Sequence, residues 1–413
     1  MKNGWTGGQY SGYRLIFGCY LLIHFLDLLP WGPELFSMRG VLPRASDSPL
    51  IHLFPNILGL WDGPFFVQLL LALAVVLSVL FAIGYWDRAA AVGLWYLSAC
   101  LLGRNPLILN PGMPYIGWLL LAHAFVPAAP YGSVAALGRP DPRGGWKMPP
   151  SIYFAAWMLM ALGYTYSGAM KLRSPSWIDG SAFARVLENP LARPGFVRVW
   201  LLSLPPAALY FATWTALAFE LLFAPLALLR RLRPWLWTVM LLMHIGLFAL
   251  VNFADLTAGM VVLHLFTFDP EWVPPAGQGR AETVFYDGHC GLCHRAVRFV
   301  MAEDRAGEAF RFAPLQGETF RALVPAAKRA NLPDSVVVRT SDGELLVRSS
   351  AFIHIFRRLG GGWRVLVAVL GVVPRGLRDA AYDLVARVRY RIFGRREDVC
   401  PIVPAELRKR FDL

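Results

Sequence analysis

The stretch YTYSGAMKLRSPSWIDG, residues 164–180, ends a long apolar run with a lysine. That run has about the 20 residues that a helix needs to cross a bilayer. A lysine at such an end, here Lys171, either anchors the helix at the interface or faces a polar cavity and takes part in chemistry. Ser167 and Gly168 are small enough for a helix or ligand to approach closely, and Tyr164 brings a hydroxyl that needs a partner. We therefore predict a membrane helix with a candidate polar site at its end.

The composition divides the chain into two parts. Of the 413 residues, 56% are hydrophobic and 16% are charged, which is typical of a membrane protein. The apolar residues are concentrated before Asp269, and the remainder has the mixed charge of a globular domain. The Pro- and Gly-rich stretch at residues 270–280 indicates a linker. We predict a polytopic α-helical membrane domain over residues 1–272, a linker over 273–282, and a small α/β domain over 283–413.

The apolar runs predict about eight membrane crossings. With eight, both termini share a side with the most basic loops, at residues 87–88, 138–147 and 230–233. Basic loops stay in the cytoplasm, so we expect an integral protein of a bacterial inner membrane with both termini cytoplasmic. An odd number of crossings would place the two termini on opposite sides of the membrane. The net charge of +13 then indicates cytoplasmic loops and anionic lipid, and no nucleic-acid-binding motif accompanies it.

Two further ionisable residues lie within apolar runs. Glu220 is costly in a bilayer unless it is paired, so it either pairs with a lysine or arginine for structural reasons or holds a catalytic group. His244 lies in the next run, where a lone histidine is more often structural than catalytic. The sequence leaves both alternatives open.

The first part of the chain resembles a known membrane family. The pattern Y-x-x-S-G-x-x-K-L followed by W-x-D-G, with the ending LFTFDPEW at residues 265–272, is similar to the membrane domain of vitamin K-dependent gamma-carboxylase and its bacterial HTTM relatives. The resemblance runs from about Gly12 to Trp272. It implies that Lys171 is the base that starts hydroquinone chemistry and that a quinone or hydroquinone is the cofactor. The implied binding residues are Tyr164, Ser167, Gly168, Trp177, Glu220, His244 and Asn252.

The second part contains a candidate redox motif. A β-prone run, TVFY at residues 283–286, is followed by DGHCGLCH and then by a segment with helical periodicity. A C-x-x-C at the start of a helix is typical of a thioredoxin-like site, because the helix N-terminus lowers the pKa of the first thiol. We predict that Cys290 attacks and that Cys293 resolves the mixed disulfide. The flanking His289 and His294 would help ionisation.

A metal site is the alternative for these cysteines. A C-x-x-C is also half of a zinc site, and Cys400 with one of the two histidines would complete four ligands. A second C-x-x-C is missing from the sequence, so we expect no metal.

Longer strings in this part resemble the DCC family of thiol-disulfide oxidoreductase-like proteins. They are YDGHCGLC, FRFAPLQ at residues 310–316, VVVRTSDGELLVRSSA at 336–351, and the tail at 374–400. In family members the stretch near Ser349 usually reads Ser-Asp-Ala, whereas this chain has Ser350 in place of the acid. The resemblance implies a thioredoxin-like fold and redox-active thiols. The arginine-rich segment at residues 387–396 is most simply a membrane-surface patch.

Together these features predict a membrane-bound redox enzyme. The helical domain would carry out quinone-linked, gamma-carboxylase-like chemistry, and the thiol pair would supply electrons. The expected partners are the lipid bilayer, a quinone, and a protein or peptide thiol or disulfide. One alternative is a thiol-disulfide oxidoreductase tethered by a structural membrane domain, in which Lys171 is dispensable. Another is a transporter.

Overall fold

A computed structural model describes residues 3–128, 131–137, 139, 146–252, 254–277, 279–397, 401 and 403–412. The chain forms two compact units. The first comprises Tyr13–Ala128 and Pro149–Phe268, and the second comprises Lys2–Gly12, Ala129–Met148 and Asp269–Leu413. The second unit therefore includes two segments that precede the C-terminal part in the sequence.

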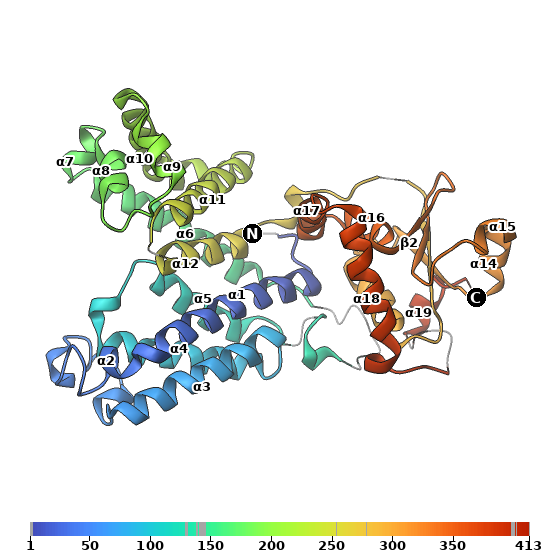
Figure 1. Cartoon of the computed structure of the whole chain (residues 1–413), viewed down its shortest axis with the longest axis horizontal. Coiled ribbons are helices and arrows are strands. Elements are labelled where there is room, and N and C mark those ends of the chain that lie inside the picture. The colour runs from blue at the N-terminus through green and yellow to red at the C-terminus, as the bar shows by residue number, and fades with distance from the viewer. Residues whose placement is uncertain are drawn as a thin grey trace. The chain divides into compact units, whose positions relative to one another are not determined.

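The first unit is built from helices (Figure 1). Several of them begin with a proline in the first turn, where its missing N–H costs nothing because that group has no partner within the helix. The helices are α1 (Gly7–Leu28), α2 (Gly32–Phe36), α3 (Pro64–Ile83), α4 (Asp87–Arg104), α5 (Met113–Phe125), α6 (Pro150–Lys171), α7 (Pro175–Ile178), α8 (Ala182–Glu188), α9 (Phe196–Leu202), α10 (Pro206–Ala227), α11 (Arg233–Leu250) and α12 (Ala254–Thr267). The start of α1 lies within the second unit.

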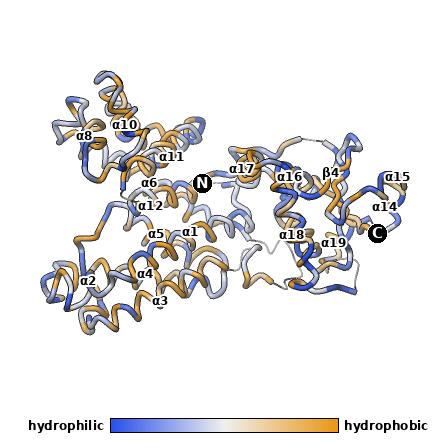
Figure 2. The backbone as a smooth tube through the Cα atoms, in the orientation of Figure 1, coloured by the Kyte–Doolittle hydropathy of each residue, from blue (hydrophilic) through white to orange (hydrophobic). Residues whose placement is uncertain are grey.

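Within the described residues, four helical segments are long and apolar enough to cross a membrane: Gly7–Phe36, α3, α10 and α11. Figure 2 shows how apolar residues follow one another along α3. These segments are compatible with the predicted membrane protein. The α5 and α12 helices are apolar but shorter, with 13 and 14 residues. The prediction of about eight crossings therefore stays a prediction.

The second unit contains a four-stranded sheet in the order β2-β1-β3-β4. The strands are β1 (Glu282–Tyr286), β2 (Phe310–Pro314), β3 (Val337–Arg339) and β4 (Leu345–Val347). Its helices are α13 (Gly291–Glu303), α14 (Glu318–Leu323), α15 (Ala326–Arg329), α16 (Arg348–Leu359), α17 (Gly361–Leu370), α18 (Arg375–Phe393) and α19 (Ala405–Arg408). The β1 and β2 strands are parallel and joined through α13, whereas β3 pairs antiparallel with β1 and β4.

The sheet is covered on both faces, which explains why all five residues of β1 are buried. Successive side chains of a strand point to opposite faces. Val284 and Tyr286 pack in a cluster with Val297 and Met301 of α13, whereas Phe285 packs with Phe320 in a second cluster. The predicted α/β domain is confirmed as a small mixed sheet with helices, and the predicted strand, turn and helix around the thiols are present.

Candidate functional site

The two thiols lie at the junction of β1 and α13. Cys290 is the N-terminal capping residue of α13, and its Sγ accepts a hydrogen bond from the backbone N–H of Cys293 at 3.4 Å. Unpaired N–H groups at a helix start favour a negative charge, so this position favours the thiolate of Cys290. Neither cysteine is in a disulfide. Cys290 is buried and Cys293 is half-buried.

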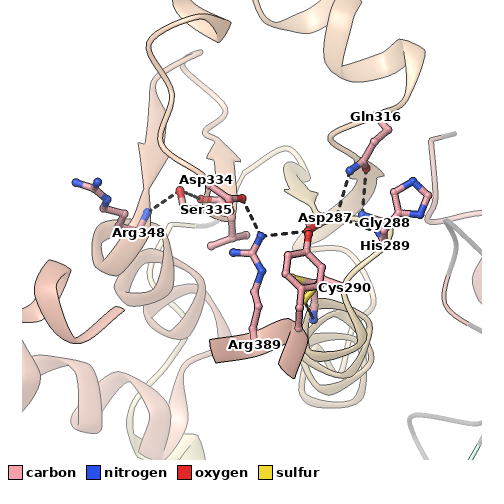
Figure 3. Close-up of polar contacts among 12 residues, drawn as sticks. Asp287, Gly288, His289, Cys290, Gln316, Asp334, Ser335, Arg348 and Arg389 are labelled. Carbon is pink, nitrogen blue, oxygen red and sulfur yellow. Dashed lines mark hydrogen bonds and ion pairs between the residues drawn. The ribbon is translucent and has the colours of Figure 1, made fainter. Parts of the chain in front are cut away.

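The Asp287 carboxylate holds the loop before the thiols. Its Oδ1 accepts hydrogen bonds from the backbone N–H of His289 at 3.0 Å and from Nε2 of Gln316 at 3.1 Å (Figure 3). The Gln316 Oε1 in turn accepts the N–H of Gly288 at 3.1 Å. On the other side, Oδ2 of Asp287 accepts from Nη2 of Arg389 at 3.1 Å and from the Tyr390 hydroxyl. Burial raises the pKa of Asp287, but the hydrogen bonds, with Tyr390 the strongest, outweigh it and lower that pKa.

Arg389 connects Asp287 with the loop before β3. Its Nη2 also bonds Oδ1 of Asp334 at 2.8 Å (Figure 3). Arg389 is only 4% exposed although it lies within the predicted surface patch at residues 387–396. That prediction is wrong for Arg389, because the side chain faces the thiol loop. Its charge also favours the anionic forms of both cysteines.

The pKa values of the two thiols move in opposite directions. The hydrogen bond from the Cys293 thiol is the strongest influence on Cys290, and with nearby backbone N–H groups and Arg389 it outweighs burial and lowers the pKa of Cys290 to about 6. The same hydrogen bond, reinforced by burial and the negative charge of Cys290, raises the pKa of Cys293. At neutral pH the pair therefore contains one thiolate and one thiol, the arrangement that thiol-disulfide exchange requires.

The two flanking histidines contact the loop backbone. His294 is buried, with Nε2 2.7 Å from the carbonyl oxygen of Gly288. His289 is exposed, with Nδ1 3.2 Å from the carbonyl oxygen of Arg396. Their predicted help to thiol ionisation stays a prediction. Cys400 lies outside the described residues, and among those that are described no group of three or more His, Cys, Asp or Glu side chains could hold a metal ion.

The segment after α18 covers Cys290. The N–H of Gly291 donates to the carbonyl oxygen of Gly394 at 3.2 Å, and the N–H of Arg396 donates to that of His289 at 2.9 Å. A Cβ on Gly291 would lie 2.3 Å from the carbonyl oxygen of Phe393, so only glycine allows this approach.

We expect Gly291→Ala to destabilise the second unit by about 1–3 kcal/mol, because the new methyl meets fixed backbone. It should also speed alkylation of Cys290, since the covering segment must move. The matched control is Gly376→Ala on α18, where a Cβ meets nothing within 4 Å. Thermal unfolding of both variants measures the change in stability, and iodoacetamide labelling measures the alkylation rate of Cys290. Equal stability of the two variants would contradict the assigned contact.

A cavity of about 770 Å³ adjoins Cys293 within the second unit. Cys293, Asp287, Arg389 and Tyr382 line it together with serine side chains. Most of the remaining wall is apolar and comes from α13, α16 and α18. This volume is typical of sites for small molecules. The thiol pair therefore borders a mainly apolar cavity through Cys293.

In the first unit, Lys171 pairs with Glu220. The Lys171 ammonium at the end of α6 contacts both carboxylate oxygens of Glu220 on α10. It also lies 4.4 Å from the ring centre of Trp177 on α7. Gly168 permits this proximity, since a Cβ there would lie 2.8 Å from the backbone nitrogen of Leu221. The structure thus brings four of the predicted site residues together and gives Glu220 the partner that its burial requires.

Tyr164 belongs to a second cluster in this unit. Its hydroxyl lies 2.7 Å from Nε2 of His244 and 3.3 Å from Nε2 of His264. Ser167 is half-buried on α6. Asn252 is exposed, and its backbone N–H donates to the carbonyl oxygen of Leu191 at 2.7 Å. The predicted residues therefore divide between two clusters, and no hydrogen bond or ion pair among the described residues joins Asn252 to either.

Sequence reasoning missed the groups that surround the thiols: Asp287, Gln316, Asp334, Arg389 and Tyr390. All of these except Asp334 were within the quoted family strings, but only Asp287 and Gln316 follow buried strands. Residues at the carboxyl ends of neighbouring parallel strands meet at one sheet edge, which is a usable signal for these two. Arg389 and Tyr390 lie about 100 positions later in the sequence, with separations of 102 and 103 residues from Asp287. No local pattern predicts that contact.

Comparisons with known proteins agree with this geometry. Residues 284–395 match the family model of DCC1-like thiol-disulfide oxidoreductases. The chain is 36% identical over 132 residues to the uncharacterized protein YuxK of Bacillus subtilis, covering 31% of this chain and 91% of that protein. It is 33% identical over 119 residues to a chloroplastic DCC family protein of Arabidopsis thaliana, covering 29% of this chain and 68% of the relative.

No solved structure matches the chain. The family match lies within the second unit, so the resemblance of the first unit to gamma-carboxylases stays a prediction. The family description suggests an oxidoreductase activity at the thiol pair. Through residues 284–395, this chain belongs to the DCC1-like thiol-disulfide oxidoreductases.

Proposed function

We propose that the chain is a membrane-associated oxidoreductase in which Cys290 and Cys293 cycle between dithiol and disulfide in a thioredoxin-like manner. The observation that carries this proposal is the position of Cys290 at the N-terminal cap of α13, where its Sγ accepts the N–H of Cys293 at 3.4 Å. The opposite pKa shifts of the two thiols follow from this geometry. Oxidation of this thiolate–thiol pair forms one S–S bond and releases two electrons and one proton. Asp287 and Arg389 position the loop and take no part in the electron transfer.

We propose a quinone as the electron acceptor. The cavity beside Cys293 has a mainly apolar wall, whereas an extended peptide would need polar partners for its backbone groups. Arg389, Tyr382 and three serines, Ser133, Ser335 and Ser349, supply polar groups in the wall to which a quinone oxygen could bind. The quinone gains two electrons and one proton from the thiol pair and one proton from water, and becomes a hydroquinone.

The geometry suggests an order for the two sulfurs. Cys293 lines the cavity, whereas Cys290 is buried beneath the segment after α18. A quinone in the cavity would therefore first bond to the Cys293 sulfur, whose proton passes to the quinone oxygen. The Cys290 thiolate would then attack that sulfur, and the disulfide forms as the bond between Cys293 and the quinone breaks and the hydroquinone leaves, taking its second proton from water. For a protein or peptide disulfide approaching from outside, the predicted order with Cys290 as attacking thiol remains our alternative.

Membrane association supports a quinone because quinones dissolve in bilayers. The four apolar segments suffice to anchor the chain. We propose that α4, α5, α6 and α12 bring the number of crossings to the eight predicted from the sequence, with both termini on the cytoplasmic side.

Hydroquinone chemistry at Lys171 is the second candidate function. The observation that favours it is the contact between the Lys171 ammonium and Glu220, a carboxylate that could receive the lysine proton and leave a neutral amine as base. The same contact serves equally as a structural ion pair, which is the expectation for a tethered oxidoreductase. Carbon deprotonation and carboxylation have no support beyond the resemblance.

The test uses the reduced full-length protein in lipid nanodiscs with a fully substituted benzoquinone, which offers thiols no free ring position. Hydroquinone formation and thiol loss are followed together. We expect one hydroquinone per dithiol, none with Cys290→Ser, and slower reaction with Ala296→Phe, which narrows the cavity. The matched control is Ala380→Phe, at an exposed position on α18 outside the cavity wall.

Three outcomes separate the candidates. Unchanged turnover in Lys171→Met supports the thiol pair as the quinone-reducing site. Loss of quinone turnover in Lys171→Met with unchanged reduction of a peptide disulfide supports the second candidate. Reduction of a peptide disulfide by wild type without any quinone turnover would sink the quinone proposal and leave the tethered thiol-disulfide oxidoreductase.

A further inference from the structure

The α17–α18 pair presents an apolar surface to solvent. Val372, in the turn between the helices, is 84% exposed, and Val369 is 66% exposed. Other large apolar side chains of this pair are more than a third exposed: Val365, Leu366, Val373, Leu377, Leu384, Val385, Val388 and Ile392. A soluble domain rarely exposes so many large apolar side chains on one helix pair, so a partner is expected.

The exposed residues of α18 form one stripe. Leu377, Leu384, Val388 and Ile392 are separated by seven, four and four residues, which places them on one face of the helix. The face around Tyr382 and Arg389 is turned instead toward the cavity and the thiol loop. The apolar stripe is therefore unused by the site described above.

The charges beside the stripe are of one sign. Arg387 and Arg391 are exposed, and within the described part of the chain neither forms an ion pair. The two acids of α18 are half-buried and already have partners. Asp379 bonds to Ser349 at 2.5 Å and pairs with Arg375 at 3.4 Å, and Asp383 pairs with Arg348 at 3.1 Å. A partner thus meets apolar side chains flanked by arginines, without an opposing negative charge.

We infer that the α17–α18 surface binds the interface of a bilayer that contains anionic lipid. An amphipathic helix with a basic flank lies in the headgroup region with its apolar residues inserted, and arginines pair with lipid phosphates. The same chain carries four segments able to cross a membrane, so a bilayer is present at high local concentration. A second protein would have to supply a negative charge opposite each arginine beside its apolar contact surface. A bilayer with anionic lipid supplies both the negative charges and the apolar interior.

The test uses the full-length chain and measures how deeply the α17–α18 surface lies in the bilayer. A fluorophore is attached to Val372→Cys or, as the matched control, to Asp342→Cys in the exposed turn between β3 and β4. All native cysteines are replaced by serine, and thermal unfolding confirms that each variant is folded. The protein is reconstituted into vesicles of phosphatidylcholine with or without phosphatidylglycerol. Quenching is measured with a nitroxide-labelled lipid and with aqueous iodide.

We expect the nitroxide lipid to quench the label at position 372 but not the label at 342, with iodide showing the reverse. Reversing two charges with Arg387→Glu and Arg391→Glu should weaken binding to the anionic bilayer by more than about fivefold at each position, because an attractive charge is lost and a repelled one is added. The same reversals at Arg321 and Lys328, exposed residues away from this surface, should have no effect. Equal lipid quenching at 372 and 342 would overturn the inference. So would shielding of position 372 from both quenchers, which would indicate a protein partner or a second copy of this chain.

Discussion

Cys290→Ser should lower dithiol-driven turnover by about three orders of magnitude or more, because it removes the thiolate and the sulfur that closes the disulfide. The remaining Cys293 has a raised pKa, so it is mostly protonated and reacts slowly at neutral pH. Turnover of a small chromogenic disulfide and of the substituted quinone measures the loss. The control is Cys100→Ser, a buried cysteine on α4 that should leave turnover unchanged.

The pH dependence tests the same thiolate independently of turnover. The reactive form of Cys290 is deprotonated, so its alkylation rate should rise as the pH rises through about 6 and then level off. Arg389→Gln removes a positive charge that lowers this pKa, so the midpoint should move to higher pH. A midpoint near the ordinary thiol value in wild type would contradict the capping arrangement at the start of α13.

Arg389→Leu should destabilise the second unit by about 3–5 kcal/mol, because it leaves the buried carboxylate of Asp287 without its positive partner. The two side chains are only 5% and 9% exposed, so water cannot replace the lost bond easily. Hydrogen exchange of the β1 backbone amides in the full-length protein measures the change, with rates expected to rise by about two to four powers of ten. The neighbouring Arg387→Leu, at an exposed position, should change them little.

The stability lost in Arg389→Leu should also depend on pH. The pKa of Asp287 lies below its ordinary value of 3.8, so its contribution to stability is present above that value and disappears as the pH falls through the lowered pKa. Without Arg389 the pKa rises, and the loss should begin at higher pH. If the β1 backbone amides exchanged at the same rate in Arg389→Leu and in Arg387→Leu at neutral pH, the ion pair would not hold the thiol loop.

The sequence by itself determined the features that depend on neighbouring residues. Apolar runs of sufficient length predicted membrane helices, and four such segments are present. The change in composition predicted a separate α/β part after the apolar region, and the run before C-x-x-C predicted a strand, a turn and a helix with Cys290 at its start. These features follow from side-chain periodicity and helix capping, which act within a few residues.

The tertiary structure alone decided which distant groups meet. Lys171 pairs with Glu220 across 49 residues, and Arg389 reaches Asp287 across 102. The sequence predicts the same surface position for Arg387, Arg389 and Arg391. Arg389 is nevertheless buried, whereas the other two are exposed. The difference arises from the rotation of α18 against α13 and α16, which sets one face toward the thiol loop and the other toward solvent. Such a rotation is fixed by packing of the whole unit, so no local pattern contains it.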